Sequence, residues 1–262
     1  MINVVVSGAL GRMGSMICEG LAKQDDICLV AGVDPFATDD AKLPGNAVLY
    51  KSLDEALSEQ KPDAVIDFTR PDVAEKNVST VLEAGVNMIL GTTGLSEEKL
   101  QDIYNAHAKG DAALFHAPNF TTGAVLMMPF CQTAAKYFPD AEVIELHHNG
   151  KKDAPSGTAI RTAKMIAQAR QEKSQSPGKE TELEGYEGAR GAEVDGVPVH
   201  SLRGSGFVAN QEVIFGSDGQ TLTIRHDSIE RTSYLPGILL AVRSIKDLQG
   251  CVIGLEKLML KD

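Results

Sequence analysis

A short apolar segment that runs directly into a glycine-rich turn restricts the fold of this 262-residue chain more than any other feature. Ile2 to Ser7 are mostly apolar and β-branched, the segment GALGRMG (8–14) follows at once, and an amphipathic helical pattern continues through Leu21. In a strand–turn–helix unit of this kind, glycines let the backbone approach a pyrophosphate and let the helix pack closely on the strand. The pattern predicts a dinucleotide-binding βα unit.

The next predicted strand, Ile27 to Val33, ends in Asp34, which lies twenty residues after Gly14. A carboxylate at this place typically accepts hydrogen bonds from the adenosine ribose. The spacing G-x-x-G-x-x-G is less exclusive than G-x-G-x-x-G. The alternative interpretation is therefore an ordinary βα turn followed by a surface aspartate.

Strands and helices alternate through the rest of the first half, which predicts a parallel, doubly wound sheet with right-handed crossovers. Capping residues Ser52 and Ser96 mark two of the helix starts. The other predicted elements are strands at 63–68, 86–90 and 112–116 and a helix at 71–84.

Ligands collect at the carboxyl ends of the strands in such a sheet. Four segments of suitable chemistry fall there, and they predict a cofactor site: GALGRM (8–13), Asp34, GTT (91–93) and APNF (117–120).

The second half predicts an α+β module with a mixed or antiparallel sheet. Its expected elements are a helix at 122–138, a strand at 141–146, a helix from 157 to about 170, a polar excursion at 171–191, strands at 197–203, 207–215 and 220–226, and a last helix at 234–247. The last helix is expected to pack back on the first domain. The predicted fold is thus α/β, with a Rossmann-type domain at 1–120 and 228–262 and a second domain at 121–227.

The segment ELHHNGKKDAPSGTA (145–159) places a basic cluster between a strand and a helix start. The free N–H groups of a helix N-terminus favour an anion. His147, His148 and Lys151 add donors beside them, so the segment predicts a cradle for a small carboxylate or phosphate with groups able to deliver a proton. The alternative is a solvated basic loop before an ordinary helix cap.

Composition excludes several classes of function. A net charge of −11 argues against nucleic acid or an anionic membrane as a general partner. No apolar run is long enough to span a membrane, and the N-terminus lacks the basic region of a signal peptide. Four cysteines without metal-ligand spacing indicate reduced thiols in a cytoplasmic chain and no metal site. The other four histidines are expected to be structural, although His226 and the nearby Arg231 stay open.

Four segments together resemble the 4-hydroxy-tetrahydrodipicolinate reductase family of lysine and diaminopimelate biosynthesis. They are GALGRMG (8–14), DFTRP (67–71), GTTGLS (91–96) and ELHHNGKKDAPSGTA (145–159). The last segment matches the family pattern E-x-H-H-x-x-K-x-D-x-P-S-G-T-A at every fixed position. The resemblance extends over essentially the whole chain.

This resemblance implies NADH- or NADPH-dependent reduction of a small cyclic dicarboxylate, with loss of water, by a homotetramer assembled through the second domain's sheet. It implies that His147 and Lys151 are catalytic and that His148, Gly157 and Thr158 bind substrate. The implied cofactor contacts are Gly8, Ala9, Leu10, Gly11, Arg12, Met13, Asp34, Gly91, Thr92, Thr93, Ala117, Pro118, Asn119 and Phe120.

The chain departs from the family after Asp34, where Pro35 and Phe36 replace the base that often meets the 2′-phosphate of NADPH. We therefore expect NADH to be preferred, with NADPH as a second coenzyme. Rival interpretations are another two-domain dehydrogenase acting on an amino acid or sugar, and a non-catalytic NAD sensor. The first does not require HHxxK before PSGTA, and the second predicts loss of His147 or Lys151. A DNA-binding redox regulator would need a basic recognition element, and the net charge of −11 argues against one.

Overall fold

The computed structural model describes residues 1–172 and 185–260. Its contacts divide the chain into two compact units, and each is described by itself. The first unit contains Met1–Phe120 and Tyr234–Asp262, and the second contains Thr121–Ser233. The chain therefore returns to the first unit at Tyr234, whereas the sequence placed the boundary at residue 228.

A seven-stranded sheet forms the centre of the first unit, in the order β12-β6-β5-β4-β1-β2-β3. Every pair of neighbouring strands is parallel, which confirms the predicted doubly wound sheet. The strands are β1 (Ile2–Ser7), β2 (Ile27–Val33), β3 (Val48–Tyr50), β4 (Ala64–Asp67), β5 (Asn87–Leu90), β6 (Leu114–His116) and β12 (Cys251–Ile253).

The helices of this unit begin where the sequence provides caps. Ser52 accepts a hydrogen bond from the Glu55 amide at 3.3 Å, and Ser96 accepts one from the Lys99 amide at 3.1 Å. The helical elements are α1 (Arg12–Leu21), α2 (Leu53–Gln60), α3 (Pro71–Glu83), α4 (Glu97–His107), α7 (Leu235–Ser244), the 3₁₀ turn Ile245–Asp247 and α8 (Glu256–Met259).

The strands are buried on both faces because helices pack on each side. Val5 and Val65 belong to a core cluster completed by residues of α2, α3 and α4. Val4 and Val6 alternate with Val5, point to the opposite face and are also fully buried. The order of the strands reverses at β1, which pairs with β2 on one side and β4 on the other. Ligands bind at such a switch point in α/β sheets.

The second unit contains a mixed five-stranded sheet in the order β11-β10-β7-β9-β8. The central strand β7 is parallel to β9 and antiparallel to β10. The elements are α5 (Thr122–Ala134), β7 (Asp140–His147), α6 (Gly157–Glu172), β8 (Ala192–Val194), β9 (Val197–Arg203), β10 (Ala209–Ser217), β11 (Gln220–Ser228) and the 3₁₀ turn Arg231–Tyr234, which leads into the first unit.

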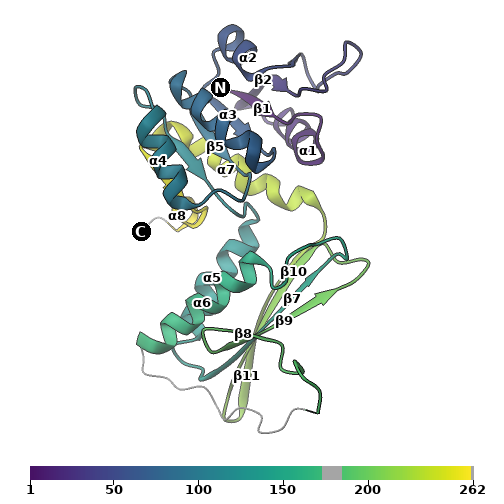
Figure 1. The fold of residues 1–262 in the computed structure, drawn as a ribbon, viewed down its shortest axis with the longest axis vertical. Helices are drawn as coiled ribbons and strands as arrows, with labels where there is room; N and C mark the ends of the chain where they lie inside the picture. The colour runs from purple at the N-terminus through teal and green to yellow at the C-terminus, as the bar shows by residue number, and fades with distance from the viewer. Residues whose placement is uncertain (173–184, 261–262) are drawn as a thin grey trace. The chain divides into compact units, whose positions relative to one another are not determined.

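Helices α5 and α6 pack on each other and on one face of this sheet (Figure 1). Val143, Val213 and Phe215 point toward the helices and meet Ala163 and Ile166 of α6 in a buried cluster. The face that α5 and α6 leave uncovered carries four partly exposed aliphatic side chains: Ile144, Leu146, Leu202 and Ile214.

The sequence predicted two helices too long. The helix expected to reach Phe138 ends at Ala134, because the chain tightens into turns that place the Phe138 ring 6.0 Å from the Phe215 ring. The helix expected to reach Asp247 ends at Ser244 and continues as a 3₁₀ turn. The short elements β3, β8, β12 and α8, each of three or four residues, were not predicted. Most of the polar excursion at 171–191 lies outside the described residues. No helix in the described part of the chain has the length and apolarity needed to cross a membrane.

Candidate active site

The glycine turn after β1 has the geometry that the sequence predicted. Gly8 has a positive φ of +77°, a conformation that side chains rarely adopt. A Cβ added to Gly14 would lie 2.0 Å from the Gly8 carbonyl oxygen, so only glycine allows α1 to approach the turn this closely. The helix N-terminus formed there can accept a phosphate.

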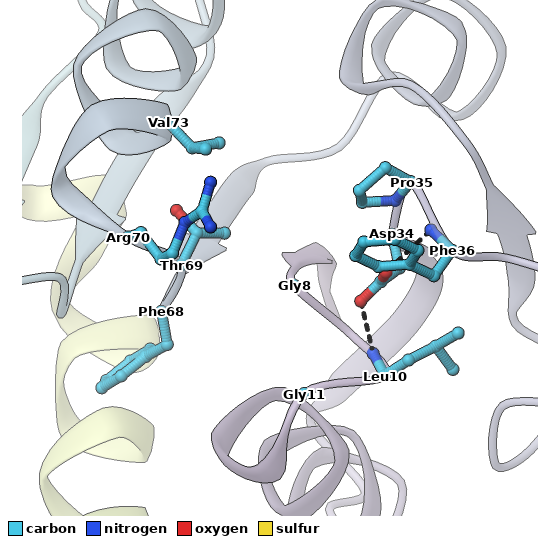
Figure 2. A pocket seen from close by; sticks show the side chains of 10 residues that line it. All are labelled: Gly8, Leu10, Gly11, Asp34, Pro35, Phe36, Phe68, Thr69, Arg70 and Val73. Atoms are coloured by element: carbon cyan, nitrogen blue, oxygen red, sulfur yellow. Dashed lines mark hydrogen bonds between the residues drawn. The ribbon is translucent and has the colours of Figure 1, made fainter.

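A cavity of about 520 Å³ opens beside this turn, at the carboxyl ends of β1, β2 and β4 (Figure 2). Its walls are mostly apolar, and Arg70 is the only cationic side chain among the residues that line it. The lining residues are Gly8, Leu10, Gly11, Asp34, Pro35, Phe36, Phe68, Thr69, Arg70 and Val73. An adenine ring and its ribose fit the size and chemistry of this space.

Asp34 is held rigidly at the rim of this cavity. Its carboxylate accepts hydrogen bonds from the Leu10 amide at 3.0 Å and from the Phe36 amide at 3.1 Å (Figure 2). The side chain therefore fixes the glycine turn to the loop after β2. Each carboxylate oxygen keeps a further lone pair for a ribose hydroxyl.

The structure brings together only some of the predicted cofactor residues. Gly8, Leu10, Gly11 and Asp34 line the cavity, whereas Arg12, Met13 and the segments 91–93 and 117–120 do not. Ala9 is fully buried behind the turn. The predicted cofactor set omitted one wall, formed by Phe68, Thr69, Arg70 and Val73 after β4. The signal was present in the sequence, because the DFTRP segment follows a strand of the same parallel sheet.

Two of the predicted segments adjoin this wall without lining the cavity. The Phe68 and Phe120 rings pack with centroids 5.4 Å apart. A Cβ on Gly91 would lie 2.1 Å from the Phe68 ring, so this glycine allows the ring to cover the loop after β5.

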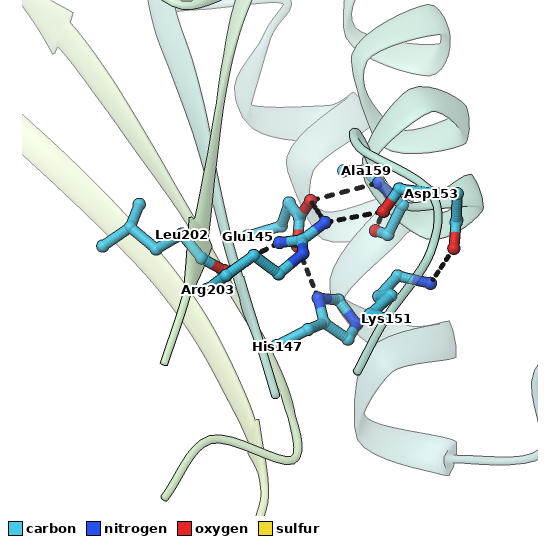
Figure 3. A network of polar contacts seen from close by, with 8 residues as sticks. Glu145, His147, Lys151, Asp153, Ala159, Leu202 and Arg203 are labelled. Carbon is cyan, nitrogen blue, oxygen red and sulfur yellow. Dashed lines mark hydrogen bonds and ion pairs between the residues drawn. The ribbon is translucent and has the colours of Figure 1, made fainter. Parts of the chain in front are cut away.

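The basic cluster of the second unit forms around the end of β7 (Figure 3). The ring nitrogen Nδ1 of His147 contacts the carboxylate of Glu145, which is fully buried. Lys151 lies in the following loop, and its Nζ donates to Asp153 at 2.8 Å. His148 is exposed beside them.

Helix α6 begins immediately after this loop. Ser156 caps the helix, since its Oγ accepts from the Ala159 amide at 3.2 Å. The preceding amides of Gly157 and Thr158 belong to the first turn, where N–H groups have no acceptor within the helix. A Cβ on Gly157 would meet nothing within 4 Å, so space is open beside these amides. Oriented N–H groups, Lys151 and two histidines thus form a site suited to a carboxylate.

The environment of His147 favours a neutral imidazole. Burial is the largest cause that lowers the pKa of His147, and the nearby charges of Lys151 and Arg203 lower it further. The Glu145 carboxylate opposes them, because it stabilises the protonated ring. A half-buried histidine that contacts a carboxylate can exchange a proton with a ligand.

The other histidines have structural contacts. His107 pairs with Glu83 at 2.6 Å, His200 pairs with Glu142 at 2.7 Å, and the buried His116 contacts the Leu90 carbonyl oxygen at 3.0 Å. His226 is half-buried against Gly123, and Arg231 is exposed in the following 3₁₀ turn. Within residues 1–172 and 185–260, no group of three or more acidic, histidine or cysteine side chains is placed to hold a metal.

Comparison with known families accounts for both units. The family model described as "Dihydrodipicolinate reductase, N-terminus" matches residues 2–120, and the corresponding C-terminal model matches residues 123–259. The chain belongs to the dihydrodipicolinate reductase family. This membership confirms the resemblance drawn from the glycine turn and the segment 145–159.

Full-length relatives in the family are close in sequence. The chain is 48% identical to 4-hydroxy-tetrahydrodipicolinate reductase of Mycolicibacterium smegmatis over 259 residues, which cover 98% of this chain and 99% of the relative. It is 47% identical to the enzyme of the same name from Listeria welshimeri, with 98% and 100% of the two chains covered.

A solved structure of the family has the same fold. The dipicolinate-bound dihydrodipicolinate reductase of Paenisporosarcina sp. TG-14 superposes with a TM-score of 0.85 at 36% identity and covers 98% of this chain and 99% of that chain. The scyllo-inositol dehydrogenase of Lactobacillus casei shares the fold alone, with a TM-score of 0.60 at 14% identity over 99% of this chain and 93% of that chain.

Proposed function

We propose that this protein reduces 4-hydroxy-tetrahydrodipicolinate to tetrahydrodipicolinate, with loss of water, in lysine and diaminopimelate biosynthesis. The observation that carries the proposal is the placement of His147 and Lys151 beside the open N-terminus of α6. This arrangement offers positive charge and oriented N–H groups to a small dicarboxylate, together with groups that exchange protons.

The substrate's carboxylates are the natural ligands of this site. Lys151 supplies a charge-assisted hydrogen bond, and the amides of Gly157 and Thr158 supply two more donors. His148 completes the site from the exposed side of the loop. Lys151 must leave Asp153 to reach a ligand. Because Asp153 is exposed to solvent, breaking this ion pair costs little free energy.

His147 and Lys151 are the proposed catalytic residues. The nicotinamide supplies the hydride when the coenzyme is bound. Hydride addition leaves an electron-rich ring carbon that takes up a proton. His147 in its protonated form delivers that proton to the substrate. Lys151 then reprotonates His147, or delivers the substrate's proton through a water molecule.

Coenzyme binding is assigned to the first unit. The cavity beside the glycine turn receives the adenosine moiety, and Asp34 accepts from its ribose hydroxyls. The carboxylate favours NADH, because a 2′-phosphate would bring negative charge close to it. The remaining predicted cofactor residues, which lie outside this cavity, are assigned to the pyrophosphate and nicotinamide parts of the coenzyme.

We assign substrate binding and subunit assembly to the second unit. The uncovered face of its sheet carries the aliphatic side chains Ile144, Leu146, Leu202 and Ile214, and we assign subunit contacts of the proposed homotetramer to this face. The four cysteines are all free, in keeping with a cytoplasmic enzyme.

A coupled assay tests the proposal. The product of dihydrodipicolinate synthase is supplied with NADH, and loss of NADH absorbance is followed. We expect turnover that depends on both substrates and that falls by about 100-fold or more in the His147→Gln variant. NADH oxidation with an inositol, a sugar or an amino acid, and none with the synthase product, would contradict it.

A further inference from the structure

Glu145 is a charged side chain in a place where an apolar one would pack. It lies on β7 with 0% of its surface exposed and points toward the helix-covered face, as Val143 does. An apolar residue of similar volume is often at least as stabilising as a buried ion pair. The carboxylate therefore suggests a role beyond stability.

Several donors surround this carboxylate, among them the side chain of Ser201 on β9. Arg203 on β9 forms two parallel hydrogen bonds, from Nη1 to Oε2 at 2.9 Å and from Nη2 to Oε1 at 2.8 Å. The Ser156 amide donates to Oε1 at 3.2 Å. His147 Nδ1 contacts Oε2 (Figure 3). Although burial favours the neutral acid, hydrogen bonds led by that of Arg203 hold the pKa of Glu145 below its usual range.

The two strands fix this geometry. Glu145 and His147 lie two residues apart on β7 and so share a face, which brings the carboxylate beside the ring. The parallel register pairs His147 with Arg203 on β9. The Arg203 guanidinium also donates to the Leu202 and Asp153 carbonyl oxygens, each at 2.7 Å, so its fork has little freedom to move.

The carboxylate also determines which nitrogen of His147 carries a proton. An ionised carboxylate only accepts hydrogen bonds, so Nδ1 must be the donor. The other nitrogen, Nε2, is then the atom left to exchange a proton with a ligand. A rotated ring or the other tautomer would leave the carboxylate without this donor.

We propose that Glu145, held in place by Arg203, is a positioning residue. It keeps His147 in the Nδ1–H tautomer and stabilises the imidazolium whose Nε2 proton goes to the substrate. This inference rests on the proposed function. Glu145 contacts no substrate atom in this role and acts through His147.

The charged groups facing His147 give the sign of the pH effect. Glu145 favours the imidazolium, Lys151 and Arg203 disfavour it, and Asp153 lies nearby, paired with Lys151. Glu145→Gln removes the favourable charge and leaves both cations, so the pKa of His147 must fall. Because the protonated ring is the proton donor, the decline of kcat with rising pH should begin at a lower pH in the variant than in the wild type.

Glu145→Gln is the main variant for the test, with Glu142→Gln as its matched control. Glu142 lies on the same strand, faces the opposite way and also pairs with a histidine and an arginine, His200 and Arg190. We expect Glu145→Gln to lower kcat at pH 7.5 at least about tenfold and to move the alkaline decline of kcat down by about 1 to 3 pH units, the range usual for loss of an adjacent opposite charge. The KM values should change less than about threefold. Glu142→Gln should keep the wild-type profile.

A second measurement does not depend on how well the variant folds. The ¹⁵N chemical shifts of labelled wild-type histidines, with His147 assigned by comparison with His147→Gln, report its tautomer and its titration. Neutral His147 should carry its proton on Nδ1. A proton on Nε2 of neutral His147, or an unshifted pH profile in the Glu145→Gln variant, would overturn the inference. The proposed function would still stand in that case if the wild-type enzyme turned over the substrate. A wild type without reductase activity would instead refute the proposed function.

Discussion

Asp67 at the end of β4 accepts a hydrogen bond from the Thr92 hydroxyl at the end of β5, with 2.9 Å between the two oxygens. The same carboxylate accepts from the Thr69 amide at 2.9 Å, the Thr69 hydroxyl at 2.7 Å and the Asn77 side chain at 2.7 Å. Asp67 is fully buried. It joins a loop that lines the cavity beside the glycine turn to the GTT loop, so both loops share one anchor.

Replacement of Asp67 by Asn should loosen both loops. The amide retains one oxygen, but its NH₂ group would face donors that previously met a carboxylate. Unsatisfied buried polar groups of this kind cost about 1–3 kcal/mol, so we expect a loss of unfolding free energy of that size. NADH affinity should fall as well. Urea unfolding and NADH fluorescence titration measure the two effects, and Asp102→Asn, which changes an exposed aspartate on α4, is the control. Unchanged stability and affinity would refute the role of the anchor.

The two residues proposed to transfer protons give the second prediction. His147→Gln and Lys151→Met should each lower kcat by about 100-fold or more, the usual effect of losing an acid–base group. NADH affinity should be nearly unchanged, because neither residue belongs to the first unit. His107→Gln removes a partly exposed histidine of α4 and should leave turnover intact. Steady-state kinetics with a separate NADH titration measure this. Near-wild-type turnover in both variants would show that the basic cluster does not deliver protons.

The sequence predicted elements well where local patterns were long and periodic. Strands β1, β2 and β9 have the predicted bounds, because alternation or a continuous apolar run was bounded by glycine, aspartate or polar residues. Strands β3 and β12 were missed because three residues carry no measurable period. Their positions depend on pairing with β2 and β6, which is a tertiary effect.

Site residues were likewise predicted where they are neighbours in the chain and missed where only the tertiary structure brings them together. Segment 145–159 placed His147, Lys151 and the start of α6 together because they are neighbours in the chain. The Arg203 fork on Glu145 could not be predicted, since it joins residues 58 positions apart through the register of β7 and β9. The Arg70 wall of the cavity was omitted for a different reason: DFTRP (67–71) follows a strand of the same parallel sheet, but only the strand order shows that this strand ends near Asp34.

The anion cradle leads to the third prediction. Pyridine-2,6-dicarboxylate should compete with substrate, because it presents two carboxylates to Lys151 and to the amides of Gly157 and Thr158. Its affinity should weaken as ionic strength rises, since the attraction is partly Coulombic. Calorimetry with and without NADH measures binding, and pyridine-2-carboxylate, with one carboxylate, is the weaker-binding control. No binding of the diacid in either state would refute the cradle.

The fourth prediction concerns the choice of coenzyme. A 2′-phosphate beside Asp34 would place like charges close together, and two unit charges about 4 Å apart repel by about 4 kcal/mol at an effective dielectric of 20. Water at the cavity rim screens most of this, and Arg70 offsets part of it. We therefore expect NADH to exceed NADPH in kcat/KM by roughly 3- to 30-fold, or about 0.7 to 2 kcal/mol. The measurement is kcat/KM for both coenzymes at saturating substrate.

Two arginine variants identify which base meets the phosphate. Arg70 lines the cavity, whereas Arg12 lies exposed at the start of α1, outside the lining. If the 2′-phosphate enters the cavity beside Asp34, Arg70→Ala should reduce kcat/KM for NADPH more than for NADH. Arg12→Ala should also reduce kcat/KM for NADPH more than for NADH only if the Arg12 side chain swings toward the phosphate. Comparison of the two variants therefore shows which arginine contacts the phosphate. A clear wild-type preference for NADPH would mean that these bases outweigh the Asp34 carboxylate, and the reasoning from Asp34 and Pro35 would then be wrong.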